Sequence, residues 1–77
     1  MIMEIGFAAG HIWQFLDKQP NRIARFSLLV SQLGISRDLL LMSVGWLARE
    51  GHVILKPEGN DYFVSLRKLD PLIGYFY

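Results

Sequence analysis

Apolar residues recur at three- and four-residue spacing along the first part of the chain, which is the period of an amphipathic helix. On a helical wheel they form one stripe, made of Ile5, Ala8, Ala9, Ile12 and Leu16. Glu4 stands at the start of this stripe, where a negative charge suits the helix dipole, and Pro20 stands just after its end. The pattern therefore predicts a first helix over about residues 4–18.

Two further helices are predicted, separated by a short turn. The second covers about residues 26–33, and Gly34 stands where a left-handed residue ends a helix. Its apolar face is narrow and consists of Leu29, Val30 and Leu33. Ser36 is a good N-cap for a third helix that runs to about Glu50 and ends at Gly51. This spacing is typical of a helix-turn-helix.

Short runs rich in β-branched and aromatic residues predict three strands. Residues 21–25 carry two apolar residues between two arginines, which suits a brief edge strand. Val53–Lys56 and Tyr62–Leu66 flank the turn-forming run Pro57–Asp61 and predict a β-hairpin. The predicted fold is α+β, with three helices, a short edge strand and a C-terminal hairpin, in one domain over residues 1–66.

The final segment, residues 67–77, is apolar where an exposed terminus would normally be polar. Six of its last nine residues are apolar or aromatic. We expect this tail to dock on its own domain or on a second subunit. The interface residues that it would supply are Leu72, Ile73, Tyr75, Phe76 and Tyr77.

Composition points to a partner more clearly than charge does. A chain of 77 residues buries only a modest core, yet 52% of this one is hydrophobic. The excess apolar surface suggests a second copy, so a homodimer is expected. Eight basic and seven acidic side chains leave a net charge of +1, which gives no global support for non-specific binding of nucleic acid.

The patterns of catalytic and cofactor sites are missing. With no cysteine, disulfides and thiolate metal sites are excluded. No second histidine or carboxylate stands at a metal-ligand spacing in the sequence from His11 or His52. There is no Gly-rich phosphate loop, nucleophile elbow or carboxylate pair, so we predict neither an enzyme nor a cofactor or metal site. Without a signal-peptide pattern or an apolar span of about 20 residues, a cytoplasmic protein with no membrane partner is expected.

The segment Leu33-Gly34-Ile35-Ser36 looks like the turn of a helix-turn-helix, and Leu47 with a closing glycine follows as at the end of a recognition helix. Residues 5–66 as a whole resemble the winged helix-turn-helix superfamily, with the hairpin as the wing. More narrowly, Gly10–Trp13 together with Gly45–Gly51 is similar to a family of small stand-alone bacterial winged-helix proteins of uncharacterised function. The resemblance implies a winged-helix fold. Because members of this superfamily commonly bind DNA, it also implies a DNA-binding regulator of transcription.

The third predicted helix has one side that faces the core and one side that faces outward. Its predicted core positions are Leu40, Ser43, Val44, Leu47 and Ala48. Its outer side carries Leu39, Met42 and Trp46, where a reader of base edges would carry Arg, Asn, Gln or Lys. This stripe is either covered by the tail or forms a subunit interface, with equal support for both, and direct reading of bases is less favoured. Gly45 would allow a close backbone approach beside Trp46.

Basic residues lie at several places where a winged helix can approach phosphates, namely Arg22, Arg25, Arg37, Lys56 and Arg67. Glu58 and Asp61 at the wing tip would repel a phosphate backbone, and solvated surface charge is the favoured alternative for the basic residues. Two functions therefore compete, and the sequence prediction places the DNA-binding regulator ahead of the interaction module. The superfamily favours a dimeric regulator that binds double-stranded DNA through these residues. The outer side of the third helix favours a dimerisation or protein-interaction module that does not bind DNA.

Overall fold

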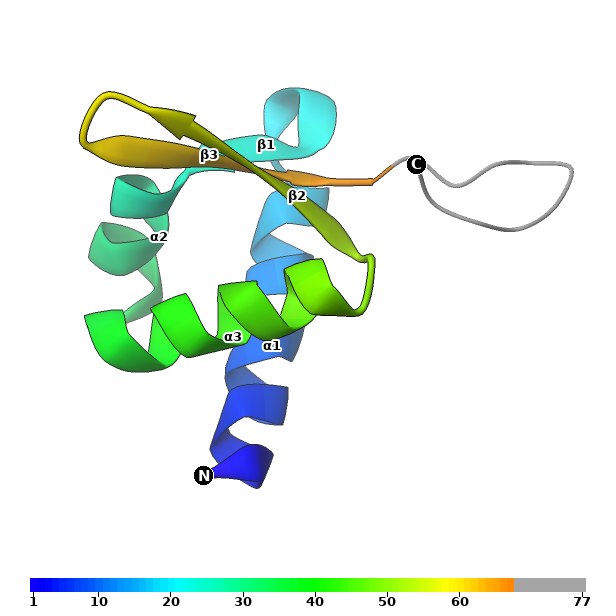
Figure 1. The fold of residues 1–77 in the computed structure, drawn as a ribbon, viewed down its shortest axis with the longest axis vertical. Helices are drawn as coiled ribbons and strands as arrows, with labels where there is room; N and C mark the ends of the chain where they lie inside the picture. Colours follow the sequence, from blue (N-terminus) through cyan, green and yellow to red (C-terminus); the bar gives the residue numbers. More distant parts are fainter. Residues whose placement is uncertain (68–77) are drawn as a thin grey trace, which may run out of the picture.

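The computed structural model describes residues 1–67, which form three helices and a three-stranded sheet (Figure 1). The tail residues expected at an interface lie outside the described residues, and they are Leu72, Ile73, Tyr75, Phe76 and Tyr77. Their docking therefore stays a prediction.

Helix α1 spans Ile2–Asp17 and begins two residues earlier than its apolar stripe predicts. The carbonyl of Met1 accepts a hydrogen bond from the Ile5 N–H at 3.0 Å, so the helical ladder already starts there. The amino group of Met1 also pairs with Glu4 Oε1 at 3.0 Å. The stripe itself is confirmed, because the buried residues of α1 are Ala8, Ala9, Ile12 and Leu16.

Helices α2 (Phe26–Leu33) and α3 (Arg37–Arg49) follow each other closely. Gly34 adopts φ 65°, the left-handed conformation that ends α2. The Ser36 side chain accepts a hydrogen bond from the Leu39 N–H at 3.2 Å, which satisfies one of the open donors at the start of α3. Both predicted caps are confirmed, and together they set the short turn of the helix-turn-helix.

The sheet has the strand order β1-β3-β2, with both pairings antiparallel. Strand β1 covers Ile23–Arg25, β2 covers Val53–Glu58 and β3 covers Asp61–Leu66. The predicted brief edge strand is confirmed, and it covers the last three of residues 21–25. Asn21 and Arg22 lie in a 3-10 turn with φ of 57° and 58°, and this left-handed backbone cannot continue an extended strand.

The wing is longer, and its turn tighter, than the sequence predicts. Strand pairing continues to Glu58 and Asp61, so the turn consists of Gly59 and Asn60 and not of the longer run expected. Gly59 supplies the positive φ, of 60°, that such a turn uses. Pro57 is tolerated within β2 because β2 is an edge strand, whose outer side needs no N–H donor.

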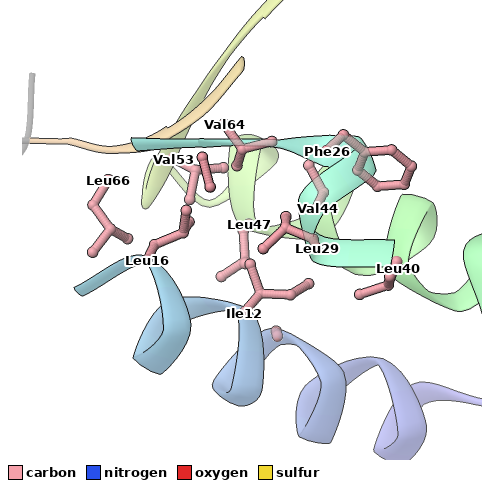
Figure 2. Packing of buried hydrophobic residues seen from close by; sticks show 12 residues of the cluster. Ile12, Leu16, Phe26, Leu29, Leu40, Val44, Leu47, Val53, Val64 and Leu66 are labelled. Atoms are coloured by element: carbon pink, nitrogen blue, oxygen red, sulfur yellow. The ribbon is translucent and has the colours of Figure 1, made fainter. Parts of the chain in front are cut away.

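The helices pack on one face of the sheet, and the hydrophobic core lies between them (Figures 1 and 2). Figure 2 labels its main members, which are Ile12, Leu16, Phe26, Leu29, Leu40, Val44, Leu47, Val53, Val64 and Leu66. Ser43 is buried among them and donates its hydroxyl to the Leu39 carbonyl at 2.7 Å. The predicted core side of α3 is therefore confirmed, and the fold is the expected α+β winged helix.

Candidate binding surfaces around helix α3 and the wing

The outer side of α3 is exposed and mostly apolar. Leu41, Met42 and Trp46 are 44%, 41% and 46% exposed. Arg37, the first residue of the helix, is the basic residue of its first two turns. Helices that read base edges usually present several Arg, Asn, Gln or Lys side chains to the major groove. This side of α3 is chemically better matched to an apolar partner.

The predicted stripe of Leu39, Met42 and Trp46 is only partly a free surface. Leu39 is half-buried, whereas Met42 and Trp46 are exposed. The tail that was expected to cover these side chains lies outside the described residues. Cover by the tail and contact with a second subunit therefore both remain predictions.

An apolar groove lies between α3 and the wing. Its volume is about 300 Å³, and it is lined by Phe26, Leu41, Val44, Gly45, Leu55 and Tyr62. We call it the wing-side groove. No atom of another described segment lies within 4 Å of the point where a Cβ on Gly45 would stand, so the close approach expected there is not made within residues 1–67. Sequence reasoning missed this groove because its walls come from four separate elements.

A second hollow, of about 490 Å³, adjoins the wing-side groove at the starts of α2 and α3. The two share Phe26 and Tyr62, whose rings meet edge to face with centroids 6.4 Å apart. Arg25 and Arg37 both line this hollow, and the Arg37 guanidinium carbon lies 5.4 Å from the centre of the Phe26 ring. These two predicted DNA-binding residues are therefore brought together by the fold.

The wing tip is fastened to α2 through Asp61. One carboxylate oxygen accepts hydrogen bonds from the backbone N–H of Ser27 at 3.2 Å and of Tyr62 at 2.8 Å. The other accepts the Ser27 hydroxyl at 2.6 Å. These donors, the Ser27 hydroxyl above all, hold the pKa of Asp61 below its usual range because they stabilise the ionised carboxylate. The carboxylate that was expected to repel DNA thus holds the wing tip against the start of α2 through hydrogen bonds.

Glu58, the other acidic residue at the wing tip, is also paired. Its Oε1 lies 2.7 Å from Nη2 of Arg25, which crosses over β3 with its guanidinium 4.5 Å from the centre of the Phe63 ring. The pair offsets the charge of Glu58, and it equally offsets the charge with which Arg25 would meet a phosphate.

The remaining predicted DNA-binding residues lie elsewhere. Arg22 Nε is 3.2 Å from Asp17 Oδ1, next to the beginning of β1. Arg67 directly follows β3, and its N–H donates to the His52 carbonyl at 3.1 Å. Lys56 stands in β2, on the sheet face that the helices leave open. Arg22 and Arg67 thus lie at the end of β3 away from the wing tip, and the five residues do not form one patch.

A third hollow lies between α1 and α3. Its volume is about 220 Å³, and it is lined by Gly6, Ala9, Gly10, Trp13, Trp46, Leu47 and His52. We call it the α1-side groove. Through Gly6 it adjoins a further hollow, of about 340 Å³, beside Met3 and Phe7. The sequence did not indicate that Gly6, Gly10 and both tryptophans would line one hollow.

Within residues 1–67, no group of three or more His, Asp or Glu side chains is placed to hold a metal ion. His11 is exposed on α1, and His52 is half-buried in the turn before β2. None of the helices in the same region is long and apolar enough to cross a membrane.

Fold and surfaces together define a small winged-helix domain with an apolar outer helix. The chain belongs to the family described as Winged helix-turn-helix domain (DUF2582), whose model matches residues 1–66. It is also similar to Uncharacterized protein MJ1608 of Methanocaldococcus jannaschii, with 23% identity over 64 residues that cover 83% of this chain and 91% of that protein. No solved structure matches. This relative is archaeal, so the bacterial character expected from the sequence stays a prediction.

Proposed function

We propose that this winged-helix domain is a non-enzymatic protein-interaction module that forms a homodimer through α3 and the wing-side groove. One observation carries the proposal: the side of α3 that a DNA-binding winged helix places in the major groove exposes Leu41, Met42 and Trp46. Apolar and aromatic side chains of this kind are enriched at the centres of protein interfaces.

The distribution of charge supports a protein partner over a duplex. Binding to DNA depends largely on basic residues that neutralise phosphates and release counterions. Here Arg25 and Arg22 already face Glu58 and Asp17, and the whole chain carries only one net positive charge. The electrostatic attraction to a phosphate backbone is therefore weak.

The amount of exposed apolar surface supports a second copy as the partner. Around the wing-side groove, Leu41, Leu55 and Tyr62 are 44%, 38% and 38% exposed. Monomeric proteins rarely leave apolar patches of this kind in water, and self-association is the simplest way to cover them.

Sedimentation velocity tests the dimer and the place of its interface. We expect the full chain to sediment as a dimer and Leu41→Glu to sediment as a monomer, because the new carboxylate would be buried in the wing-side groove. Ile54→Glu is the matched control, since Ile54 is 46% exposed but lies on the open face of the sheet. A monomeric full chain, or a dimer that Leu41→Glu leaves intact, contradicts the proposal.

A DNA-binding regulator of transcription is the second candidate, and one observation favours it. Arg25 and Arg37 line the same hollow at the starts of α2 and α3, beside the wing. If these two arginines neutralise two phosphates, log K should fall with log salt with a slope of about −2, at roughly −0.9 per phosphate. Arg37→Ala should then remove about half of that slope. No binding to random duplex near about 50 mM salt excludes this candidate.

A further inference from the structure

The α1-side groove leaves aromatic surface uncovered within residues 1–67. Trp13 of α1 and Trp46 of α3 are the two tryptophans of the chain, and both line this groove while remaining exposed. The hollow beside Met3 and Phe7 continues it along α1. The groove therefore offers an apolar track along α1 that ends beside Trp46.

Two glycines of α1 open this track. No atom of another described segment lies within 4 Å of the points where Cβ atoms on Gly6 and Gly10 would stand. Glycine in a helix interior is destabilising relative to alanine, because it loses more backbone freedom on folding. Nothing in residues 1–67 uses the space that these glycines leave, so an occupant from elsewhere gives them a role.

The described chain ends beside this groove. The N–H of Arg67 donates to the carbonyl of His52 at 3.1 Å, and His52 is one of the groove-lining residues. Residues 68–77 continue from this point with six apolar or aromatic side chains, namely Leu69, Leu72, Ile73, Tyr75, Phe76 and Tyr77. Ten residues of extended chain span up to about 33 Å, whereas the track from Trp13 to Met3 is about 15 Å long at 1.5 Å per helical residue.

We propose that the α1-side groove is the docking site for the chain's own C-terminal segment, residues 68–77, bound in cis. The aromatic residues of this segment pack against Trp13 and Trp46, and its backbone crosses α1 at Gly6 and Gly10. Because the segment starts beside the groove, its effective concentration there is high, which favours the tail of the same molecule over that of another. The wing-side groove lies on the other side of α3 and shares no lining residue with the α1-side groove. With the tail on Trp46, the proposed dimer contact on α3 consists of Leu41 and Met42, so the two sites can be tested separately.

Tryptophan fluorescence of the full chain tests the docking directly, since both emitters line the groove. With the tail in place, emission is blue-shifted and acrylamide quenches it weakly. In the full-length double variant Ile73→Asp/Phe76→Asp, we expect a red shift and a larger quenching constant. Leu28→Asp, at an exposed position on α2, is the control and should leave both readings unchanged. Equal quenching of the full chain and the double variant overturns the proposal.

Filling the groove provides a second test that does not depend on altering the tail. Gly10→Leu suits a helix better than glycine and occupies the space that the tail would use. We expect it to accelerate tryptic cleavage after Arg67 and Lys68 severalfold, because the expelled segment becomes accessible. Gln32→Leu, which adds an apolar side chain at an exposed position on α2, is the control and should leave that rate unchanged. Equal cleavage rates in Gly10→Leu and the unmodified chain overturn the proposal.

The source of the tail is decided by dilution. Docking in cis predicts that tryptophan quenching in the Leu41→Glu variant, which lacks the proposed dimer interface, is independent of protein concentration. Quenching that rises on dilution of this variant means that the tail of a second copy fills the groove, and this overturns the assignment in cis. A failed dimer test with concentration-independent quenching would reject the proposed function and leave the docking intact.

Discussion

The carboxylate of Asp61 caps the start of helix α2 from the wing, 34 positions away along the chain from Ser27. Its two oxygens accept the Ser27 N–H at 3.2 Å and the Ser27 hydroxyl at 2.6 Å. Arg25, at the N-cap position of α2, makes no side-chain capping bond. Asp61 therefore satisfies a helix-terminal donor that the local sequence leaves open, and its negative charge suits the positive end of the helix dipole.

This cap makes the stability of the domain sensitive to acid. Hydrogen bonds from the Ser27 hydroxyl and, to a smaller extent, from the Tyr62 N–H lower the pKa of Asp61 from its usual value of about 4. Because the folded pKa is below the unfolded one, the contribution is complete above that usual value and is lost as pH falls through the folded pKa. Urea unfolding between about pH 2 and 7 should show that Asp61→Asn removes this part of the acid dependence. The same pH profile in both proteins would refute the cap.

The Ser36 cap should contribute to global stability, since α3 carries three core residues. We expect Ser36→Ala to lower the free energy of unfolding by about 1 kcal/mol, because the Leu39 N–H loses its acceptor. Ser31→Ala is the control: the Ser31 hydroxyl donates to the Leu28 carbonyl within α2, and alanine is the better helix former there. Chemical denaturation measures both, and equal effects would contradict the prediction.

Two neighbouring leucines, Leu40 and Leu41, distinguish the buried side of α3 from its exposed side by their effect on stability. Leu40 is fully buried, so Leu40→Ala should leave a cavity and lower the free energy of unfolding by about 2–5 kcal/mol. Leu41 is 44% exposed, so Leu41→Ala should lower it by less than about 1 kcal/mol. Thermal unfolding of the two variants at equal, low protein concentration checks the contrast. A reversed order would mean that α3 is rotated about its axis.

The ion pair between Arg25 and Glu58 should be weak but measurable. Its side chains are about half exposed, and exposed pairs typically contribute about 0.2–1 kcal/mol. A double-mutant cycle with Arg25→Gln and Glu58→Gln should give a coupling free energy in that range, and added salt should reduce it. Glu58→Gln also frees Arg25, so it should strengthen binding to duplex if the DNA-binding candidate is right. An unchanged affinity for duplex would mean that Arg25 does not contact a phosphate.

Much of the fold could be predicted from the sequence because its signals are local. The buried positions of α1 follow from the spacing of Ala8, Ala9, Ile12 and Leu16 along a helix. The end of α2 and the start of α3 follow from the backbone preference of Gly34 and the side-chain acceptor of Ser36. Each of these effects acts within one or two helical turns, so no knowledge of the rest of the molecule is needed.

The candidate site could be predicted only in part. The apolar outer side of α3 was predicted from helical spacing. The wing-side groove was not predicted, since Leu41, Leu55 and Tyr62 come from three elements whose approach depends on packing. The grouping of Arg25 with Arg37, and their separation from Arg22 and Arg67, likewise depends on the order of strands in the sheet.

The sequence by itself determined which segments are helices, which side of each helix is buried, and that α3 presents an apolar outer side. Tertiary structure alone decided that Pro57 lies in an edge strand, that Asp61 caps α2, and that Trp13 and Trp46 share a groove. The physical reason is the range of the interactions. Helical periodicity and capping join residues a few positions apart, whereas strand register, cross-element hydrogen bonds and grooves arise only when distant segments pack together.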